Sequence, residues 1–129
     1  MNIHIVFKGS LRGTWPLFKK NYMSMIHEPL LEQGHKIKVS AHLWEEEYNE
    51  DFAKEFSSIE VTEYPLHWRE LNPYTTLKGM FDDVIDYCSI NSKDTDYYII
   101  LRPDLLYKSP INLYLDLNKE FDILLPHRE

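Results

Sequence analysis

The residues Tyr97–Leu101 (Y-Y-I-I-L) form a short run with no polar alternation and two β-branched isoleucines near its centre. Such a run is typical of a strand that is covered on both faces, so we predict a central parallel strand. The run stops at Arg102-Pro103-Asp104. Pro103 has no backbone donor and favours an extended conformation for Arg102. In open α/β sheets ligands bind where strands have their carboxyl ends, so Arg102 and Asp104 are candidate site residues.

Other segments show alternating strand and helix patterns. Period-two or short apolar runs predict strands over residues 3–7, 36–44, 59–64 and 121–125. Helical spacing predicts helices from Trp15 to His27, after Glu45, and from Asn72 to Ile90, the last with a core face of Leu77, Phe81, Val84, Ile85 and Cys88. We predict an α/β fold: a three-layer, mainly parallel, Rossmann-like sheet with helices on both faces.

A few residues mark where the predicted helices begin and end. Thr14 is expected to cap the first helix, and Pro29 should end or kink it because proline lacks an N–H and clashes with the preceding turn. One more helical turn, residues 30–33, should then end at Gly34, a plausible C-terminal cap.

Size and charge limit the class of protein. A chain of 129 residues with 43% hydrophobic content can bury one core, so residues 1–129 should form a single domain. Its one cysteine, Cys88, fits a reducing compartment. No basic leader and no apolar run of about 20 residues is present, so we expect no membrane span and a cytoplasmic location. The net charge of −7 argues against a nucleic-acid partner.

The charge is unevenly distributed along the chain. Residues 1–44 hold six Lys/Arg and two Asp/Glu, a net +4, so the remaining residues carry −11. A small anionic ligand would therefore favour the first third of the chain. A solvated acidic surface in the rest of the chain is the simpler explanation of the asymmetry.

A glycine-containing loop, Gly9–Gly13, follows the first predicted strand. Its glycines would let backbone N–H groups approach an anion at the start of the next helix, and Arg12 could clamp a phosphate with two hydrogen bonds. The loop matches neither the P-loop nor the dinucleotide fingerprint. A tight turn that requires glycine explains it equally well.

Asp104 is the candidate ligand for a divalent metal, because Mg²⁺ and Mn²⁺ prefer oxygen ligands and commonly share them with substrate phosphates. The alternative is a surface pair with Arg102, or an aspartate that caps the following turn. The six histidines show no metal-ligand spacing. His42 and Trp44 end a predicted strand near the same edge and could stack on or hydrogen-bond a base, although a core edge explains Trp44 as well.

Several motifs carry a resemblance to a known family. Residues 7–12 (F-K-G-S-L-R), then Asn21, Pro29-Leu30 and His42-Leu43-Trp44, resemble the start of GT-A-type nucleotide-sugar glycosyltransferases, which read F-S-G-Q-x-R, N, P-L and H-T-W. Residues 99–111 (I-I-L-R-P-D-L-L-Y-K-S-P-I) are similar to their I-R-x-R-x-D-L-x-F-x-x-P-I segment, which stands in place of the D-x-D metal motif.

The resemblance implies a nucleotide-diphosphate sugar as donor. It implies Gly9, Ser10 and Arg12 near the nucleotide, and Arg102 and Asp104 near the pyrophosphate and a Mn²⁺ or Mg²⁺ ion. Two departures are visible: Lys8-Gly9-Ser10 replaces S-G-Q, and Arg102 replaces the first acid of D-x-D, so guanidinium charge could take the place of a metal.

In the family an acceptor-binding half follows, whereas this sequence ends at Glu129. We therefore expect that a second chain or an oligomer supplies the acceptor side. Three hypotheses remain open at this point: a small glycosyltransferase-like domain, a non-catalytic or degenerate donor-binding module that needs a partner chain, and an unrelated flavodoxin-like or regulatory α/β domain.

Overall fold

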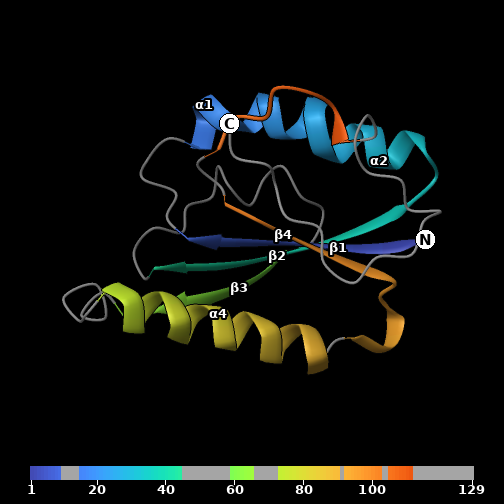
Figure 1. The fold of residues 1–129 in the computed structure, drawn as a ribbon. Helices are drawn as coiled ribbons and strands as arrows, with labels where there is room; N and C mark the ends of the chain where they lie inside the picture. The colour runs from blue at the N-terminus through green and yellow to red at the C-terminus, as the bar shows by residue number, and fades with distance from the viewer. Residues whose placement is uncertain (10–14, 45–58, 66–72, 91, 103–104, 112–129) are drawn as a thin grey trace.

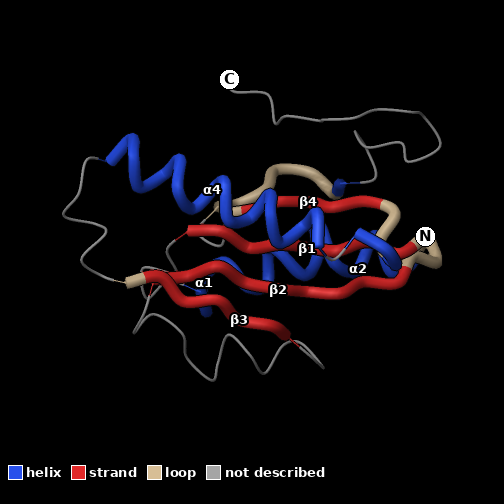
Figure 2. The backbone as a smooth tube through the Cα atoms, turned by 90° about the horizontal axis from the view of Figure 1, so that it is seen from below, coloured by secondary structure: helices blue, strands red, loops and turns tan. Residues whose placement is uncertain are grey.

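The computed structural model describes residues 1–9, 15–44, 59–65, 73–90, 92–102 and 105–111; within these, the side chains of residues 73–78, 80 and 92 are not described. Four strands, β1 (Asn2–Gly9), β2 (Lys36–Trp44), β3 (Ile59–Tyr64) and β4 (Tyr97–Leu101), form one sheet in the order β3-β2-β1-β4. Every pair in this sheet is parallel, and Figure 2 shows the strands side by side. The predicted α/β class with a parallel sheet is confirmed.

Helices cover both faces of the sheet, which gives three layers (Figure 1). On one face lie α1 (Trp15–Tyr22), the π-helical segment η1 (Met23–His27) and α2 (Glu28–Glu32). On the other face lies α4 (Pro73–Ile90), which is followed by the 3₁₀ turn η3 (Ser92–Asp94) and then β4. Because every pair of strands is parallel, all four strands have their carboxyl ends at one edge of the sheet.

The main hydrophobic core lies between the sheet and α1. Side chains alternate between the two faces of a strand, so every second residue of β1 points toward α1. These residues are Ile3, Ile5 and Phe7, each at most 1% exposed, and they pack with the buried Trp15 and Tyr22. The period-two pattern of the sequence therefore located this face correctly, and the predicted bounds of β2, β3 and β4 are confirmed.

The predicted kink at Pro29 takes the form of a π-helical turn. Proline has no N–H, and its ring would clash with the carbonyl four residues earlier. The chain widens before this point, where the Glu28 N–H donates to the Met23 carbonyl, a five-residue spacing. The helical path therefore continues to Glu32 instead of breaking at His27.

Gly34 ends this helical stretch, as predicted. Its φ of 87° lies in the left-handed region that favours glycine. The Gly34 N–H donates to the Leu31 carbonyl at 2.9 Å and the His35 N–H to the Leu30 carbonyl at 3.2 Å. These two bonds form a Schellman cap, which satisfies the terminal carbonyls and turns the chain directly into β2.

The bounds of α4 are confirmed, and Val84 belongs to the core face as predicted, but Phe81 and Ile85 do not. Phe81 and Ile85 are 49% and 43% exposed, whereas Val84 is fully buried and Tyr87 is half-buried. The helix is rotated because the sheet face beneath it carries polar side chains, which Tyr87 can hydrogen-bond and Phe81 cannot. Cys88 is half-buried, and burial raises the pKa of its thiol, as expected for an unreactive cysteine.

Strand β4 is parallel to β1, as predicted, but among the described residues it is not central. It pairs only with β1, and Ile100 is 38% exposed. An apolar run indicates that both faces of a strand are covered but carries no information about its second edge, so a central position does not follow from the pattern alone. The Thr14 cap, the helix after Glu45 and the strand over residues 121–125 lie outside the described residues.

None of the described helices is long and apolar enough to cross a membrane.

Candidate functional site

Two cationic residues come together at the carboxyl edge of the sheet. The parallel register pairs Phe7 with Leu101, so the next residues, Lys8 and Arg102, leave neighbouring strands side by side. Lys8 is half-buried, and its pKa is lowered from the ordinary value by burial and then by the positive charge of Arg102. Neighbouring cations of this kind favour an anion that neutralises both.

The backbone at this edge is also suited to an anion. Gly9, the last residue of β1, has a φ of 128°, which glycine adopts without strain and other residues rarely adopt. The amino ends of α1 and α4 lie at the same end of the molecule as the strand carboxyl ends (Figure 1). Helix amino ends carry partial positive charge, so they add to the field of Lys8 and Arg102.

The sequence-predicted site is thus only partly described. Gly9 and Arg102 lie at the same edge, at the ends of adjacent strands. Ser10, Arg12 and Asp104 lie outside the described residues. Lys8 was missed as a site residue, although its place directly before Gly9 could have identified it, because a residue that follows the last core position of a strand reaches the sheet edge.

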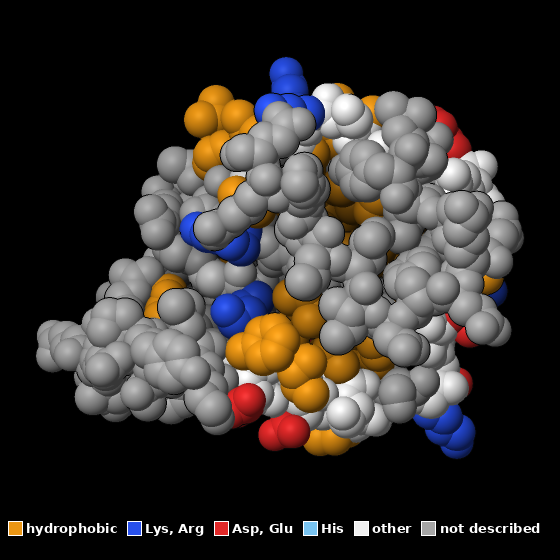
Figure 3. Space-filling view, viewed as in Figure 1, with side chains coloured by type: hydrophobic (Ala, Val, Ile, Leu, Met, Phe, Trp, Pro, Cys, Tyr) orange, Lys and Arg blue, Asp and Glu red, His pale blue; other side chains and the backbone are white. Residues whose placement is uncertain are grey.

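Figure 3 shows Lys and Arg atoms in the left half of this face, on the side where the strands have their carboxyl ends, and others at the top and at the lower right. Hydrophobic atoms lie next to those in the left half, above α4. Among the described residues, no group of three or more His, Cys, Asp or Glu side chains is arranged to hold a metal ion.

The opposite, amino edge of the sheet has a groove of about 310 Å³, and Lys36, Lys38 and Lys93 are among the residues that line it. These lysines are exposed. Lys93 therefore provides a control cation that is far from the carboxyl edge.

His42 and Trp44, expected as possible contacts to a base, are buried. His42 is 2% exposed, and its Nδ1 lies 2.8 Å from the Tyr64 hydroxyl. Trp44 is 8% exposed and meets the ring of Tyr64 edge-on at 6.4 Å between centroids. These side chains pack the end of the sheet, which agrees with the core-edge alternative for Trp44.

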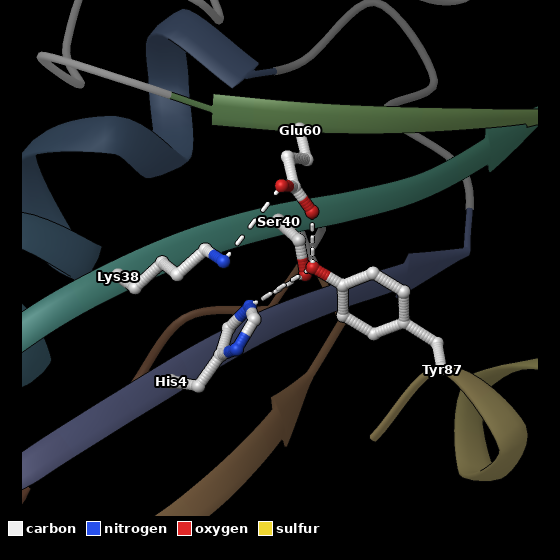
Figure 4. Close-up of polar contacts among 5 residues, drawn as sticks. All are labelled: His4, Lys38, Ser40, Glu60 and Tyr87. Atoms are coloured by element: carbon white, nitrogen blue, oxygen red, sulfur yellow. Dashed lines mark hydrogen bonds and ion pairs between the residues drawn. The ribbon is translucent and has the colours of Figure 1, made fainter. Parts of the chain in front are cut away.

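A polar cluster occupies the sheet face beneath α4 (Figure 4). His4 Nε2 lies 3.0 Å from Ser40 Oγ and 3.4 Å from the hydroxyl of Tyr87, which reaches the sheet from α4. The Tyr87 hydroxyl donates to Glu60 Oε2 at 2.6 Å, and Glu60 Oε1 lies 3.7 Å from Lys38 Nζ. The cluster joins β1, β2 and β3 to α4.

This cluster is not arranged as a nucleophilic site. Ser40 and His4 are 1% and 0% exposed, so no substrate reaches the serine hydroxyl. In the described part of the chain, His4 Nδ1 has no hydrogen-bond partner and hence no carboxylate to orient the ring. Burial, together with the charge of Lys38, lowers the pKa of His4 to about 4, so the ring is neutral at pH 7. The cluster holds α4 on the sheet.

Asn21 of α1 makes a two-point contact with the chain that follows Arg102. Its side-chain Nδ2 donates to the Tyr107 carbonyl at 2.9 Å, and the Tyr107 N–H donates to Asn21 Oδ1 at 2.6 Å. Tyr107 and Ile111 pack against the main core. The segment of residues 105–111 is therefore attached to the α1 side of the sheet.

No known family model matches the chain, and no curated protein matches it either.

Proposed function

We propose that this chain is a glycosyltransferase-like domain that binds a nucleotide-diphosphate sugar at the carboxyl edge of its sheet. The observation that carries the proposal is the placement of Lys8 and Arg102 at the ends of adjacent parallel strands. A diphosphate offers two adjacent anionic groups, which match two adjacent cations. The resemblance of the motifs around Gly9, Arg12 and Asp104 to nucleotide-sugar transferases supports the choice of ligand.

In this proposal Lys8 and Arg102 neutralise the diphosphate. Arginine suits this role because its planar guanidinium binds phosphate with two hydrogen bonds, and a half-buried lysine is screened less by water than an exposed one. Positive charge at the edge also opposes a divalent cation. Residues Gly9, Ser10 and Arg12 would bind the nucleotide, and Asp104 would hold Mn²⁺ or Mg²⁺ if the reaction requires one.

A second candidate function is donor binding without transfer, in a module whose acceptor side comes from a partner chain. The cationic character of the edge favours it, since Arg102 stands where related enzymes carry the first acid of their metal motif. Binding needs only this charge, whereas transfer also needs a base that activates the acceptor.

The proposal is tested by thermal unfolding of the full chain with UDP, GDP, CDP and ADP, each with and without Mn²⁺. At least one nucleotide should raise the melting temperature, because a ligand that binds only the native state stabilises it. Lys8→Gln and Arg102→Gln should each reduce this shift, whereas the control Lys93→Gln at the amino edge should leave it unchanged. The absence of any shift at millimolar nucleotide would overturn the proposal and leave an unrelated α/β domain.

Two further experiments test separately whether Asp104 binds a metal ion and whether the chain transfers the sugar. Asp104→Asn should abolish the part of the shift that depends on Mn²⁺; an unchanged shift excludes Asp104 as the ligand. Release of free sugar from a panel of nucleotide sugars, or its transfer to added acceptors, would favour the enzyme. Binding without either reaction would favour the donor-binding module.

A further inference from the structure

Asn21 is the feature that the proposed function does not use. It lies 86 residues from Tyr107 in the sequence, yet its side-chain amide pairs with both backbone polar groups of that residue. The amide acts as a donor toward the carbonyl and as an acceptor toward the N–H, so only this orientation of the side chain satisfies both bonds. Asn21 thereby makes the same two kinds of hydrogen bond to the Tyr107 backbone that a residue of a neighbouring strand would make.

This pairing bears on the candidate site because Tyr107 lies only five residues after Arg102 in the chain. Upstream, Leu101 is the last residue of β4 and is held by its pairing with Phe7. Downstream, Tyr107 is held by Asn21, and Ile111 is buried in the core. Arg102 therefore lies between two described contacts: the pairing of Leu101 one residue before it and the bonds of Asn21 to Tyr107 five residues after it.

We propose that Asn21 is a positioning residue that, by holding Tyr107, keeps Arg102 beside Lys8. The inference rests on the proposed function for its readout, because it assigns Asn21 to preorganisation of the diphosphate site. Asn21 itself does not contact the ligand. Preorganisation increases affinity because fewer conformations are lost on binding.

The substitution Asn21→Asp tests the contact with almost no change in shape. At pH 8 the introduced carboxylate still accepts the Tyr107 N–H, but its second oxygen faces the Tyr107 carbonyl oxygen and cannot donate. The half-buried site and the facing Tyr107 carbonyl oxygen raise the pKa of the introduced carboxyl above the ordinary value of about 4, so a fall in pH toward 5 begins to restore a donor at that position. The loss caused by Asn21→Asp should therefore be larger at pH 8 than at pH 5, which is a pH profile that a simple packing defect does not produce.

The matched control is Tyr98→Phe, which removes the bond from the Tyr98 hydroxyl to the Cys88 carbonyl at 2.8 Å. This bond ties β4 to α4 on the opposite side of the sheet. By calorimetry with the nucleotide diphosphate that gives the largest thermal shift, Asn21→Asp should weaken affinity roughly three- to tenfold at pH 8. Tyr98→Phe should leave affinity within about twofold of the wild type, because it removes no contact of residues 105–111.

Two results would overturn the inference: wild-type affinity in Asn21→Asp at pH 8, or an equal loss in Asn21→Asp and Tyr98→Phe, which would indicate general destabilisation. Hydrogen exchange provides an arm that does not depend on the ligand. Asn21→Ala, which removes the acceptor of the Tyr107 N–H, should accelerate exchange of the Tyr107 amide, and unchanged protection would refute the contact. If the wild type binds no nucleotide but the exchange result holds, the proposed function fails and Asn21 remains the residue that fixes this segment.

Discussion

The two faces of the sheet differ in what holds a helix against them. The face toward α1 is apolar, with Ile5, Phe7 and Leu43 all buried in one cluster. The face toward α4 carries His4, Ser40 and His42, which are equally buried but polar. Apolar contact is non-directional, whereas hydrogen bonds require defined partners. The first face therefore supplies most of the stability, and the second fixes how α4 lies.

Lys8 and Arg102 lie on the same side of the sheet as the polar residues. Alternation along β1 places Lys8 on the same face as His4, and alternation along β4 places Arg102 on the same face as Tyr98. The apolar residues Val6 and Ile100 separate the polar cluster from this cationic pair along the two strands.

The largest expected effect is on the apolar face. Phe7→Ala removes a ring that meets Tyr22 at 4.9 Å and Trp15 at 5.6 Å between centroids. The unfolding free energy should fall by about 3–5 kcal/mol, since a large buried side chain leaves a cavity. Urea unfolding at pH 7.5 measures this. The control Leu17→Ala, at a side chain 70% exposed, should change it by no more than about 0.5 kcal/mol. A similar loss in both variants would contradict the assignment of the core.

The second-largest expected effect is a loss of stability at acidic pH that originates in the histidines of the polar face. The folded-state pKa of His4 is lowered to about 4 from 6.5, and that of His42 is also lowered, mainly by burial. Below pH 6.5 the unfolded chain binds protons that the folded chain does not. The stability from these rings is therefore present above pH 6.5 and is lost as the pH falls toward 4, by on the order of 2 kcal/mol.

Urea unfolding at pH 7.5, 6.5, 5.5 and 4.5 measures this loss. His4→Gln should flatten the dependence on pH, because it removes one group that takes up a proton only on unfolding. It should also cost stability at pH 7.5, where the neutral ring contacts Ser40 and Tyr87. An unchanged slope in this variant would show that the acid sensitivity originates elsewhere.

Much of the fold could be read from the sequence because its signals are local. The alternation from Lys36 to Trp44 and the Asn72-Pro73 start of α4 depend only on neighbouring residues, and both predicted the correct bounds. The face of α4 could not be read in this way. The spacing of Phe81 and Ile85 indicates a core face only if the opposing sheet is apolar, and the sheet beneath α4 is polar.

The site was less predictable because its contacts join distant parts of the chain. Arg102 was identified from the end of an apolar run and Lys8 could have been identified from its place before Gly9, but that the two are neighbours follows only from the register between β1 and β4. The pairing of Asn21 with Tyr107 has no periodic signal at all. Its residue types are common, and only the tertiary structure brings them together.

The smallest expected effect concerns the hydroxyl of Tyr87, which contacts the polar face of the sheet. Tyr87→Phe removes the hydroxyl that donates to Glu60 and lies near His4 Nε2, and it should lower the unfolding free energy by about 1 kcal/mol. Because Glu60 is exposed, the energy of this hydrogen bond should lie at the low end of the range for bonds to charged groups. The control Lys38→Gln breaks the ion pair between Lys38 and Glu60. Both side chains are more than half exposed (53% and 56%), so this variant should lower the unfolding free energy by at most a few tenths of a kcal/mol.

In a double-mutant cycle, Tyr87→Phe and Glu60→Ala should show a coupling energy roughly equal to the cost of Tyr87→Phe itself. A larger loss in Lys38→Gln than in Tyr87→Phe would reverse the conclusion, because surface charge and not the directed hydroxyl would then hold α4 on its polar face.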